Sequence, residues 1–84
     1  MEQPTVFLYA LSTCGHCRAA KKLLDDQGVV YDFVYVDQLS RDELKKTLEE
    51  VAKVNPQRSF PTILIGEKVI VGNREEEILE ALGL

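Results

Sequence analysis

The chain has 84 residues, 29% of them charged, and a formal net charge of −4, so the length predicts one domain over residues 1–84 with a small core. Nucleic-acid binding needs a basic surface that this acidic chain lacks, and no apolar run approaches the length that crosses a bilayer. Residues 1–13 also lack the basic stretch that opens a signal peptide, so we expect a cytoplasmic protein without nucleic-acid or membrane partners.

The first part of the chain predicts a strand, a helix and a second strand. Residues 5–10 are short, β-rich and apolar on both faces, as in a strand buried within a sheet. A helix is expected next, with Ser12 or Thr13 as its N-terminal cap and Gly28 just after its end. Residues 29–36 are rich in β-branched and aromatic side chains, which favours a strand.

A second helix is predicted from a capping box. Ser40 and Glu43 have the spacing in which the serine caps the helix and the glutamate bonds back to the cap. The apolar residues that follow share one helical face; they are Leu44, Leu48 and Val51. We expect this helix to end at Asn55-Pro56, since the residue before a proline disfavours helical backbone.

The last third predicts a hairpin and a third helix. Strands are expected at residues 62–65 and 69–71, joined by the two-residue loop Gly66-Glu67. A final helix is expected with Asn73 as its cap, paired with Glu76. The order β-α-β-α-β-β-α therefore predicts an α/β fold, in which three helices flank a four-stranded mixed sheet whose first two strands run parallel.

The only two cysteines form the motif Cys14-Gly15-His16-Cys17. A disulfide across two intervening residues closes almost no loop, so its stabilising effect is small and its purpose is chemical. Cys14 follows the first strand at the start of the first helix, where free N–H groups and the helix dipole favour a thiolate. We therefore expect Cys14 to attack a substrate disulfide and Cys17, about one turn on, to resolve the mixed disulfide.

The two residues between the cysteines are expected to tune this chemistry. Gly15 leaves space beside the attacking sulfur, and a partly protonated His16 imidazole would stabilise the thiolate and make the couple more oxidising, at roughly −180 to −230 mV. Three alternatives stay open. His16 is a solvated residue without an electronic role; the cysteines are inert; or they form half of a zinc site, which needs four ligands where the chain offers two cysteines and one histidine.

Two further motifs lie in the second half. Pro61 begins a strand and follows an aromatic residue, which favours a cis peptide bond and would leave the Phe60 backbone free to pair with an extended substrate. Gly72-Asn73-Arg74 comes before a helix start, where a carboxylate could bind, although a plain helix cap explains the motif equally well.

With Cys14-Gly-His-Cys17, Phe60-Pro61-Thr62 and Val71-Gly72-Asn73-Arg74 in this order, the chain resembles a glutaredoxin-like member of the thioredoxin superfamily. The resemblance implies a thioredoxin-like fold, a nucleophile at Cys14 and a resolving cysteine at Cys17. It implies that Pro61 is the cis-proline, and that Arg58 contacts a glutathione carboxylate. The candidate substrate-binding residues are thus Thr13, Arg58, Phe60, Pro61, Gly72, Asn73 and Arg74.

The chain departs from the family pattern between its cysteines, where Gly15-His16 replaces the usual Pro-Tyr. Leu11 stands where the family has a lysine, and Gly72-Asn73-Arg74-Glu75 replaces a Gly-Gly followed by two acids. This end is more similar to the glutaredoxin-like hydrogen donors of ribonucleotide reductase, which thioredoxin reductase reduces.

The resemblance implies a monomeric oxidoreductase that acts on protein disulfides without a tightly bound cofactor. Its electron donor would be glutathione or an enzyme like thioredoxin reductase. The alternatives are a protein that binds an iron–sulfur cluster through Cys14 and glutathione from two chains, and a redox-silent adaptor that uses only the fold.

Overall fold

The computed structural model describes residues 4–83. The elements in chain order are β1 (Val6–Ala10), α1 (Gly15–Asp26), β2 (Asp32–Tyr35), the short 3-10 helix η1 (Val36–Gln38), α2 (Arg41–Val54), β3 (Thr62–Ile65), β4 (Lys68–Val71) and α3 (Glu75–Ala81). The predicted β-α-β-α-β-β-α order is confirmed, and η1 is an addition to it. None of the helices in the described part of the chain is long and apolar enough to cross a membrane.

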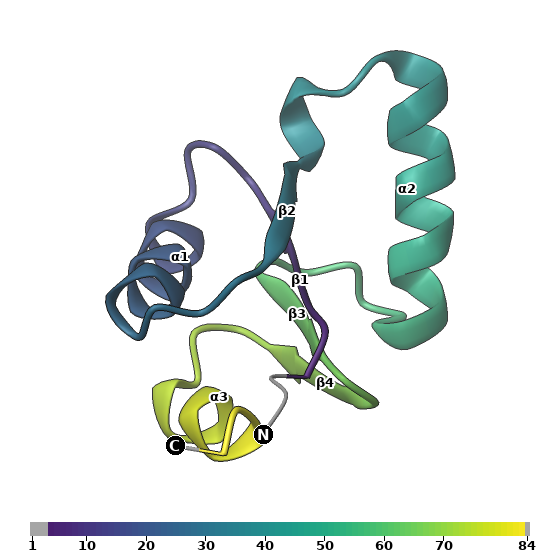
Figure 1. The fold of residues 1–84 in the computed structure, drawn as a ribbon. Helices are drawn as coiled ribbons and strands as arrows, with labels where there is room; N and C mark the ends of the chain where they lie inside the picture. Colours follow the sequence, from purple (N-terminus) through teal and green to yellow (C-terminus); the bar gives the residue numbers. More distant parts are fainter. Residues whose placement is uncertain (1–3, 84) are drawn as a thin grey trace.

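The four strands form one mixed sheet in the order β2-β1-β3-β4. β1 is parallel to β2 and β4 is antiparallel to β3, as predicted, and the structure adds that β1 pairs antiparallel with β3. Helices α1 and α3 cover one face of the sheet and α2 covers the other (Figure 1). The central strand β1 is thus enclosed on both sides, which explains why its sequence is apolar without alternation.

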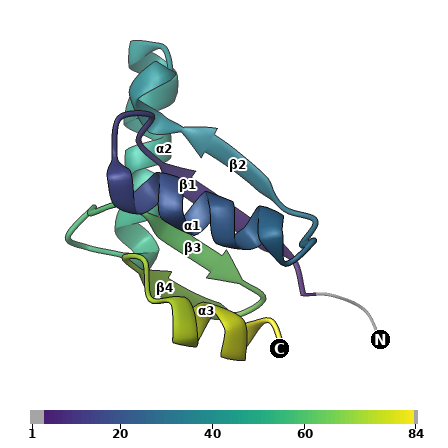
Figure 2. The same cartoon turned by 90° about the vertical axis from the view of Figure 1, so that its left-hand side faces the viewer.

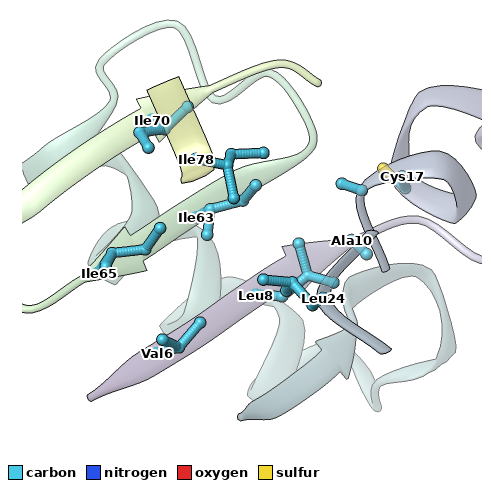
Figure 3. Close-up of a cluster of buried hydrophobic side chains, with 10 residues drawn as sticks. Val6, Leu8, Ala10, Cys17, Leu24, Ile63, Ile65, Ile70 and Ile78 are labelled. Carbon is cyan, nitrogen blue, oxygen red and sulfur yellow. The ribbon is translucent and has the colours of Figure 1, made fainter. Parts of the chain in front are cut away.

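Each face of the sheet has its own hydrophobic cluster. The larger cluster lies under α1 and α3 and contains Leu8, Leu24, Ile63 and Ile78, all fully buried, with Cys17 at the end nearest Ala10 (Figure 3). The smaller cluster lies under α2 and consists of Tyr9, Val36 and Val51, with Leu44 and Leu48 packed against it. Neighbouring residues of β1 therefore serve opposite cores.

The start of α1 differs from the prediction. Neither Ser12 nor Thr13 caps this helix; the cap is Cys14, whose backbone is extended (φ −89°, ψ 121°) and whose Sγ accepts the Cys17 N–H at 3.3 Å. The Ser12 hydroxyl instead donates a hydrogen bond to the carboxylate of Asp37. The Ser12 backbone N–H and hydroxyl both donate to the Asp37 carboxylate, 25 residues away in the sequence, so Ser12 is held in the turn after β1 and the cap is Cys14.

The second strand is shorter than the predicted range 29–36. Gly28 has φ +67° and donates to the Asp25 carbonyl, while Val29 donates to the Leu24 carbonyl, both at 3.1 Å. These two bonds form the glycine-dependent C-terminal cap that the sequence predicts. Val29 therefore belongs to the end of α1, and pairing with β1 begins only at Asp32.

The start of α3 also differs from the prediction. The cap residue is Arg74 rather than Asn73, and its side chain makes no capping bond. The Arg74 N–H donates to the Gly72 carbonyl at 3.0 Å and its Nε donates to the Val71 carbonyl at 3.1 Å, so a tight turn delays the helix by one residue. The Asn73 Oδ1 is buried and has no hydrogen-bond partner within residues 4–83.

Two other predicted turns are confirmed. Ser40 caps α2 by accepting the Glu43 N–H at 3.3 Å. Gly66-Glu67 joins β3 to β4 as a two-residue loop in which only Gly66 has a positive φ, +59°, as a hairpin with glycine first requires.

Candidate active site

The three sequence motifs meet at one end of the sheet. Tyr9, near the end of β1, pairs with Thr62 at the start of β3, which pairs with Val71 at the end of β4. The turn into α1, the segment that leads into β3 and the turn into α3 therefore lie side by side (Figure 2). The fold brings together segments that are separated by more than forty residues in the sequence.

The two cysteines, both reduced, differ in exposure and in hydrogen bonding. Cys14 is partly exposed, whereas Cys17 is only 1% exposed and forms part of the larger core cluster. The Cys14 Sγ accepts the Cys17 N–H, and the Cys17 Sγ accepts the Leu11 N–H at 3.4 Å. Cys14 is thus accessible to solvent, while the buried Cys17 sulfur is hydrogen-bonded to the turn after β1.

The site separates the acidities of the two thiols. The pKa of Cys14 is lowered, chiefly by the hydrogen bond that the Cys17 thiol donates to it, and also by the backbone N–H groups of Cys17 and His16 and the charge of Arg18. Burial raises the pKa of Cys17 to about 12. Cys14 therefore ionises first, and Cys17 keeps its proton while it stabilises the thiolate.

The residues around the pair have distinct positions. A Cβ atom added at Gly15 would meet no atom within 4 Å beyond its chain neighbours, so the space around this glycine is open. The His16 side chain is exposed, and its imidazole makes no hydrogen bond or ion pair with any residue in the range 4–83. Arg18 is a site residue beyond those predicted from the sequence, and its position one turn beyond Cys14 is the signal that indicates it.

Asn55 organises the segment before β3. It is 4% exposed, and its Nδ2 donates to the Ser59 carbonyl and to the Thr62 hydroxyl, both at 3.1 Å. Its own carbonyl accepts the Arg58 N–H at 2.9 Å, which helps to hold Arg58 in the left-handed region at φ +51°. The sequence analysis saw Asn55 only as a helix end, because nothing local indicates that its side chain bonds to residues four and seven positions later.

The Phe60-Pro61 peptide bond is cis. Pro61 is buried, and its carbonyl accepts the Gly72 N–H at 2.9 Å, which links this segment to the turn before α3. The Phe60 backbone makes no hydrogen bond within the described range of the chain, whereas its ring packs against both core clusters. Phe60 therefore has a free N–H and C=O at a fixed position.

The remaining predicted residues lie around this end. Thr13 is exposed in the turn before Cys14, and Gly72 has φ +87°, a conformation that favours glycine. Asn73 lines a shallow pocket between α1 and the start of α3, together with Lys22 and Leu23. Among residues 4–83, no three His, Cys, Asp or Glu side chains are grouped so that they could hold a metal ion.

The fold and the cysteine pair together define a thiol protein of the thioredoxin-like class. The sequence model of the glutaredoxin family matches residues 6–70. Glutaredoxin 1 of Rickettsia felis is 33% identical over 61 residues, which are 73% of this chain and 57% of that protein, so the matched stretch spans little more than half of that relative.

Two solved structures from methanogens are closely similar. The methanoredoxin of Methanosarcina acetivorans superimposes with a TM-score of 0.93 at 44% identity, covering 96% of this chain and 86% of that one. The glutaredoxin of Methanosarcina mazei gives a TM-score of 0.89 at 51% identity, covering 96% and 80%. The chain belongs to the glutaredoxin family and has its thioredoxin-like fold.

Proposed function

We propose that this protein is a dithiol thiol–disulfide oxidoreductase that reduces protein disulfides through Cys14 and Cys17. Membership of the glutaredoxin family supports the reaction class. The observation that carries the dithiol mechanism is the asymmetry of the pair. Cys14 is accessible with a lowered pKa, and Cys17 is buried one turn away with its pKa raised to about 12.

In the proposed cycle the Cys14 thiolate attacks one sulfur of the substrate disulfide. A Cys14–substrate disulfide forms, the substrate bond breaks, and the other substrate sulfur leaves as a thiolate that takes a proton. Cys17 then loses its proton to the solvent and attacks the Cys14 Sγ, which releases the second substrate thiolate. The substrate gains two electrons, and the Cys14–Cys17 pair becomes a disulfide that a donor must reduce.

We propose that the pKa of Cys17 falls once the first step is complete. While Cys14 is a thiolate, the Cys17 thiol donates a hydrogen bond to it and stays protonated. Once Cys14 is bound to substrate, its negative charge is gone, and with it two of the causes that raise the Cys17 pKa, the hydrogen bond and the charge of Cys14. Formation of the mixed disulfide therefore makes Cys17 more acidic when it is needed as a nucleophile.

We propose that the substrate lies across the end of the sheet in an extended form. Its backbone would pair with the free N–H and C=O of Phe60, next to the buried Pro61. The other side of the substrate would contact Thr13, Gly72, Asn73 and Arg74. Arg58 is exposed and forms no ion pair within residues 4–83, and it would bind a carboxylate such as that of glutathione.

The electron donor is proposed to be glutathione or an enzyme of the thioredoxin reductase kind. Glutaredoxins as a family use glutathione, which supports the first. The Gly72-Asn73-Arg74 end and the CGHC pair support the second, together with a role as hydrogen donor to a ribonucleotide reductase. We further propose that residues 1–84 act as a monomer in the cytoplasm without a resident cofactor, rather than as a cluster-binding dimer.

One experiment separates these possibilities. The reduction of insulin disulfides and of a glutathione mixed disulfide is measured for the native protein, Cys17→Ser and Cys14→Ser, with NADPH supplied through either glutathione reductase and glutathione or thioredoxin reductase. We expect Cys14→Ser to lose both activities and Cys17→Ser to lose insulin reduction. Insulin reduction that survives in Cys17→Ser would overturn the dithiol mechanism, and visible absorbance with a dimeric elution volume would favour the cluster-binding alternative.

A second measurement addresses the tuning of the pair. The potential of the Cys14–Cys17 couple is proposed to lie above thioredoxin's roughly −270 mV. Both His16→Ala and Arg18→Ala are measured in glutathione buffers. Because the Arg18 charge lowers the pKa of Cys14, Arg18→Ala should make the potential more negative; a similar change in His16→Ala would assign the tuning to the imidazole as well, and none would leave His16 as a solvated residue.

A further inference from the structure

The carboxylate of Asp37 holds the turn that connects β1 to the cysteine pair. Its Oδ1 accepts the Ser12 backbone N–H at 2.9 Å, and its Oδ2 accepts the Ser12 hydroxyl. The two residues lie 25 positions apart but meet because β1 and β2 are parallel, with Ala10 paired to Tyr35. Ser12 follows Ala10 by two residues and Asp37 follows Tyr35 by two residues, so the parallel pairing brings Ser12 and Asp37 together.

The residue next to Ser12 contacts both cysteines. The Leu11 N–H donates to the Cys17 Sγ at 3.4 Å, and the Leu11 carbonyl accepts the Cys14 N–H at 3.2 Å. A single backbone unit therefore spans the two redox residues. Because Ser12 follows directly, the two-point bond to Asp37 restrains the position and direction of that unit.

The two hydrogen bonds from Ser12 to Asp37, which we call the Asp37 tether, contribute little to the hydrophobic core. Asp37 is exposed and lies in η1, outside both core clusters, and Ser12 is only partly buried. The two hydrogen bonds from Ser12 to the Asp37 carboxylate therefore lie outside both core clusters. Their effect falls on the turn that carries the Leu11 contacts to the two sulfurs.

Asp37 is not suited to accept a proton. The hydrogen bonds from Ser12 hold the pKa of its carboxyl below the usual value, so it stays ionised. Its charge is one of the causes that raise the pKa of Cys17, so as a charge alone it opposes the attack by Cys17. A beneficial role in the reaction must come from its hydrogen bonds.

We propose that Asp37 is a positioning residue of the redox site, which through Ser12 fixes the Leu11 turn so that the Cys17 sulfur is aimed at the Cys14 sulfur. The proposal rests on the dithiol function proposed above. It assigns to Asp37 an effect on the second chemical step, the attack of Cys17 on a mixed disulfide at Cys14, and no effect on the first step.

The two steps can be followed separately with an aromatic disulfide, 5,5′-dithiobis(2-nitrobenzoate). Cys14 releases one coloured aryl thiolate when it forms the mixed disulfide, and Cys17 releases the second when it closes the Cys14–Cys17 bond. In Asp37→Ala we expect the second release to slow by about tenfold, because reacting atoms held less accurately react more slowly. The first release should keep its native rate.

The variants distinguish the tether from the charge. Loss of the Asp37 charge alone would lower the pKa of Cys17 and speed the second release. Loss of the hydrogen bonds to Ser12 would slow it, so the two effects change the rate of the second release in opposite directions. Asp37→Asn keeps an oxygen that accepts the Ser12 N–H and should restore most of the native rate. Asp32→Ala, the removal of another exposed acid from the same segment of chain, is the matched control and should leave both releases unchanged.

An unchanged or faster second release in Asp37→Ala would overturn the proposal, as would an Asp37→Asn protein as slow as Asp37→Ala. The proposed dithiol function has its own test in this assay, since without it the native protein and Cys17→Ser would both release only one aryl thiolate. Failure of the tether therefore remains distinguishable from failure of the function.

Discussion

Helices α1 and α2 begin with the same capping geometry, but their cap residues differ in chemistry, since one is a thiol and the other a hydroxyl. Cys14 and Ser40 both have extended backbone, and each side chain accepts the N–H three residues later at 3.3 Å. Each cap thus satisfies one of the helix's free donors. At Ser40 the consequence is a stable helix start; at Cys14 the same bond also lowers the pKa of a thiol, because the donor stabilises the thiolate more than the thiol.

The first turns of the two helices differ in a way that suits these roles. The first turn of α2 carries Asp42 and Glu43, as the helix dipole favours, whereas that of α1 carries no acid. An acid beside Cys14 would oppose the thiolate, and the residue one turn on is the cation Arg18 instead. The comparison shows that a cysteine can take the capping place of a serine at a helix start whose first turn carries no acid.

The largest effect should come from Cys14→Ser. The hydroxyl can still cap α1, so the free energy of unfolding should stay within about 0.5 kcal/mol of the reduced native protein, while disulfide reduction falls to background. Cys14→Ala should be equally inactive and less stable than Cys14→Ser by about 1 kcal/mol. Urea unfolding together with an insulin assay checks both; equal stability of the two variants would show that Cys14 is no functional cap.

The dependence of alkylation on pH tests the acid-strengthening effect. The thiolate is the reactive form, and the pKa of Cys14 lies below its ordinary value of 9.0. The iodoacetamide reaction at Cys14 should therefore rise with pH and reach half of its maximal rate below pH 9.0. Cys17, with its pKa raised to about 12, should stay unreactive over that range. Mass spectrometry assigns each site, and a half-point for Cys14 at or above 9.0 would contradict the effect.

Removal of the Ser40 cap of α2, which has no thiol, should change the stability of the protein and leave its thiol chemistry unchanged. Ser40→Ala removes the acceptor of the Glu43 N–H and should lower the free energy of unfolding by about 1 kcal/mol. The rate of Cys14 alkylation and the disulfide reductase activity should keep their native values. Ser40→Asp, which can still cap, is the control that should recover the stability, and a change in Cys14 reactivity would mean that the two helix starts are coupled.

The smallest effect is expected from Gly15→Pro at the first helical position. Cys14 has the extended backbone that a following proline requires, and the Gly15 N–H makes no hydrogen bond within the described residues. A Cβ atom there meets no atom within 4 Å beyond its chain neighbours. The reduced protein should gain about 0.5 kcal/mol of stability by losing freedom in the unfolded chain. Gly28→Pro, at φ +67°, should instead destabilise it, and thermal melts compare the two.

Elements whose signals are local could be predicted from the sequence. The serine cap at Ser40, the cap at Gly28 and the Gly66-Glu67 loop depend on residues within a few positions of one another, and all three are confirmed. The order of helices and strands along the chain followed from the pattern of apolar runs, whereas the order of the strands in the sheet comes from the structure. The predicted N-terminal caps of α1 and α3 are wrong for one reason. Ser12 bonds to Asp37 and Arg74 bonds to the end of β4, so contacts outside the helix rather than local capping preferences set where each helix begins.

The sequence by itself determined the class of fold, which rests on periodicity, and the family resemblance, which rests on three motifs in order: Cys14-Gly-His-Cys17, Phe60-Pro61-Thr62 and Val71-Gly72-Asn73-Arg74. Only the tertiary structure decided how the cysteine pair is supported. Burial against the core raises the pKa of Cys17, Asn55 orders the loop before Pro61, and Asp37 reaches the turn after β1. Burial and long-range hydrogen bonds depend on which segments the sheet places side by side, and no local pattern of residues contains that information.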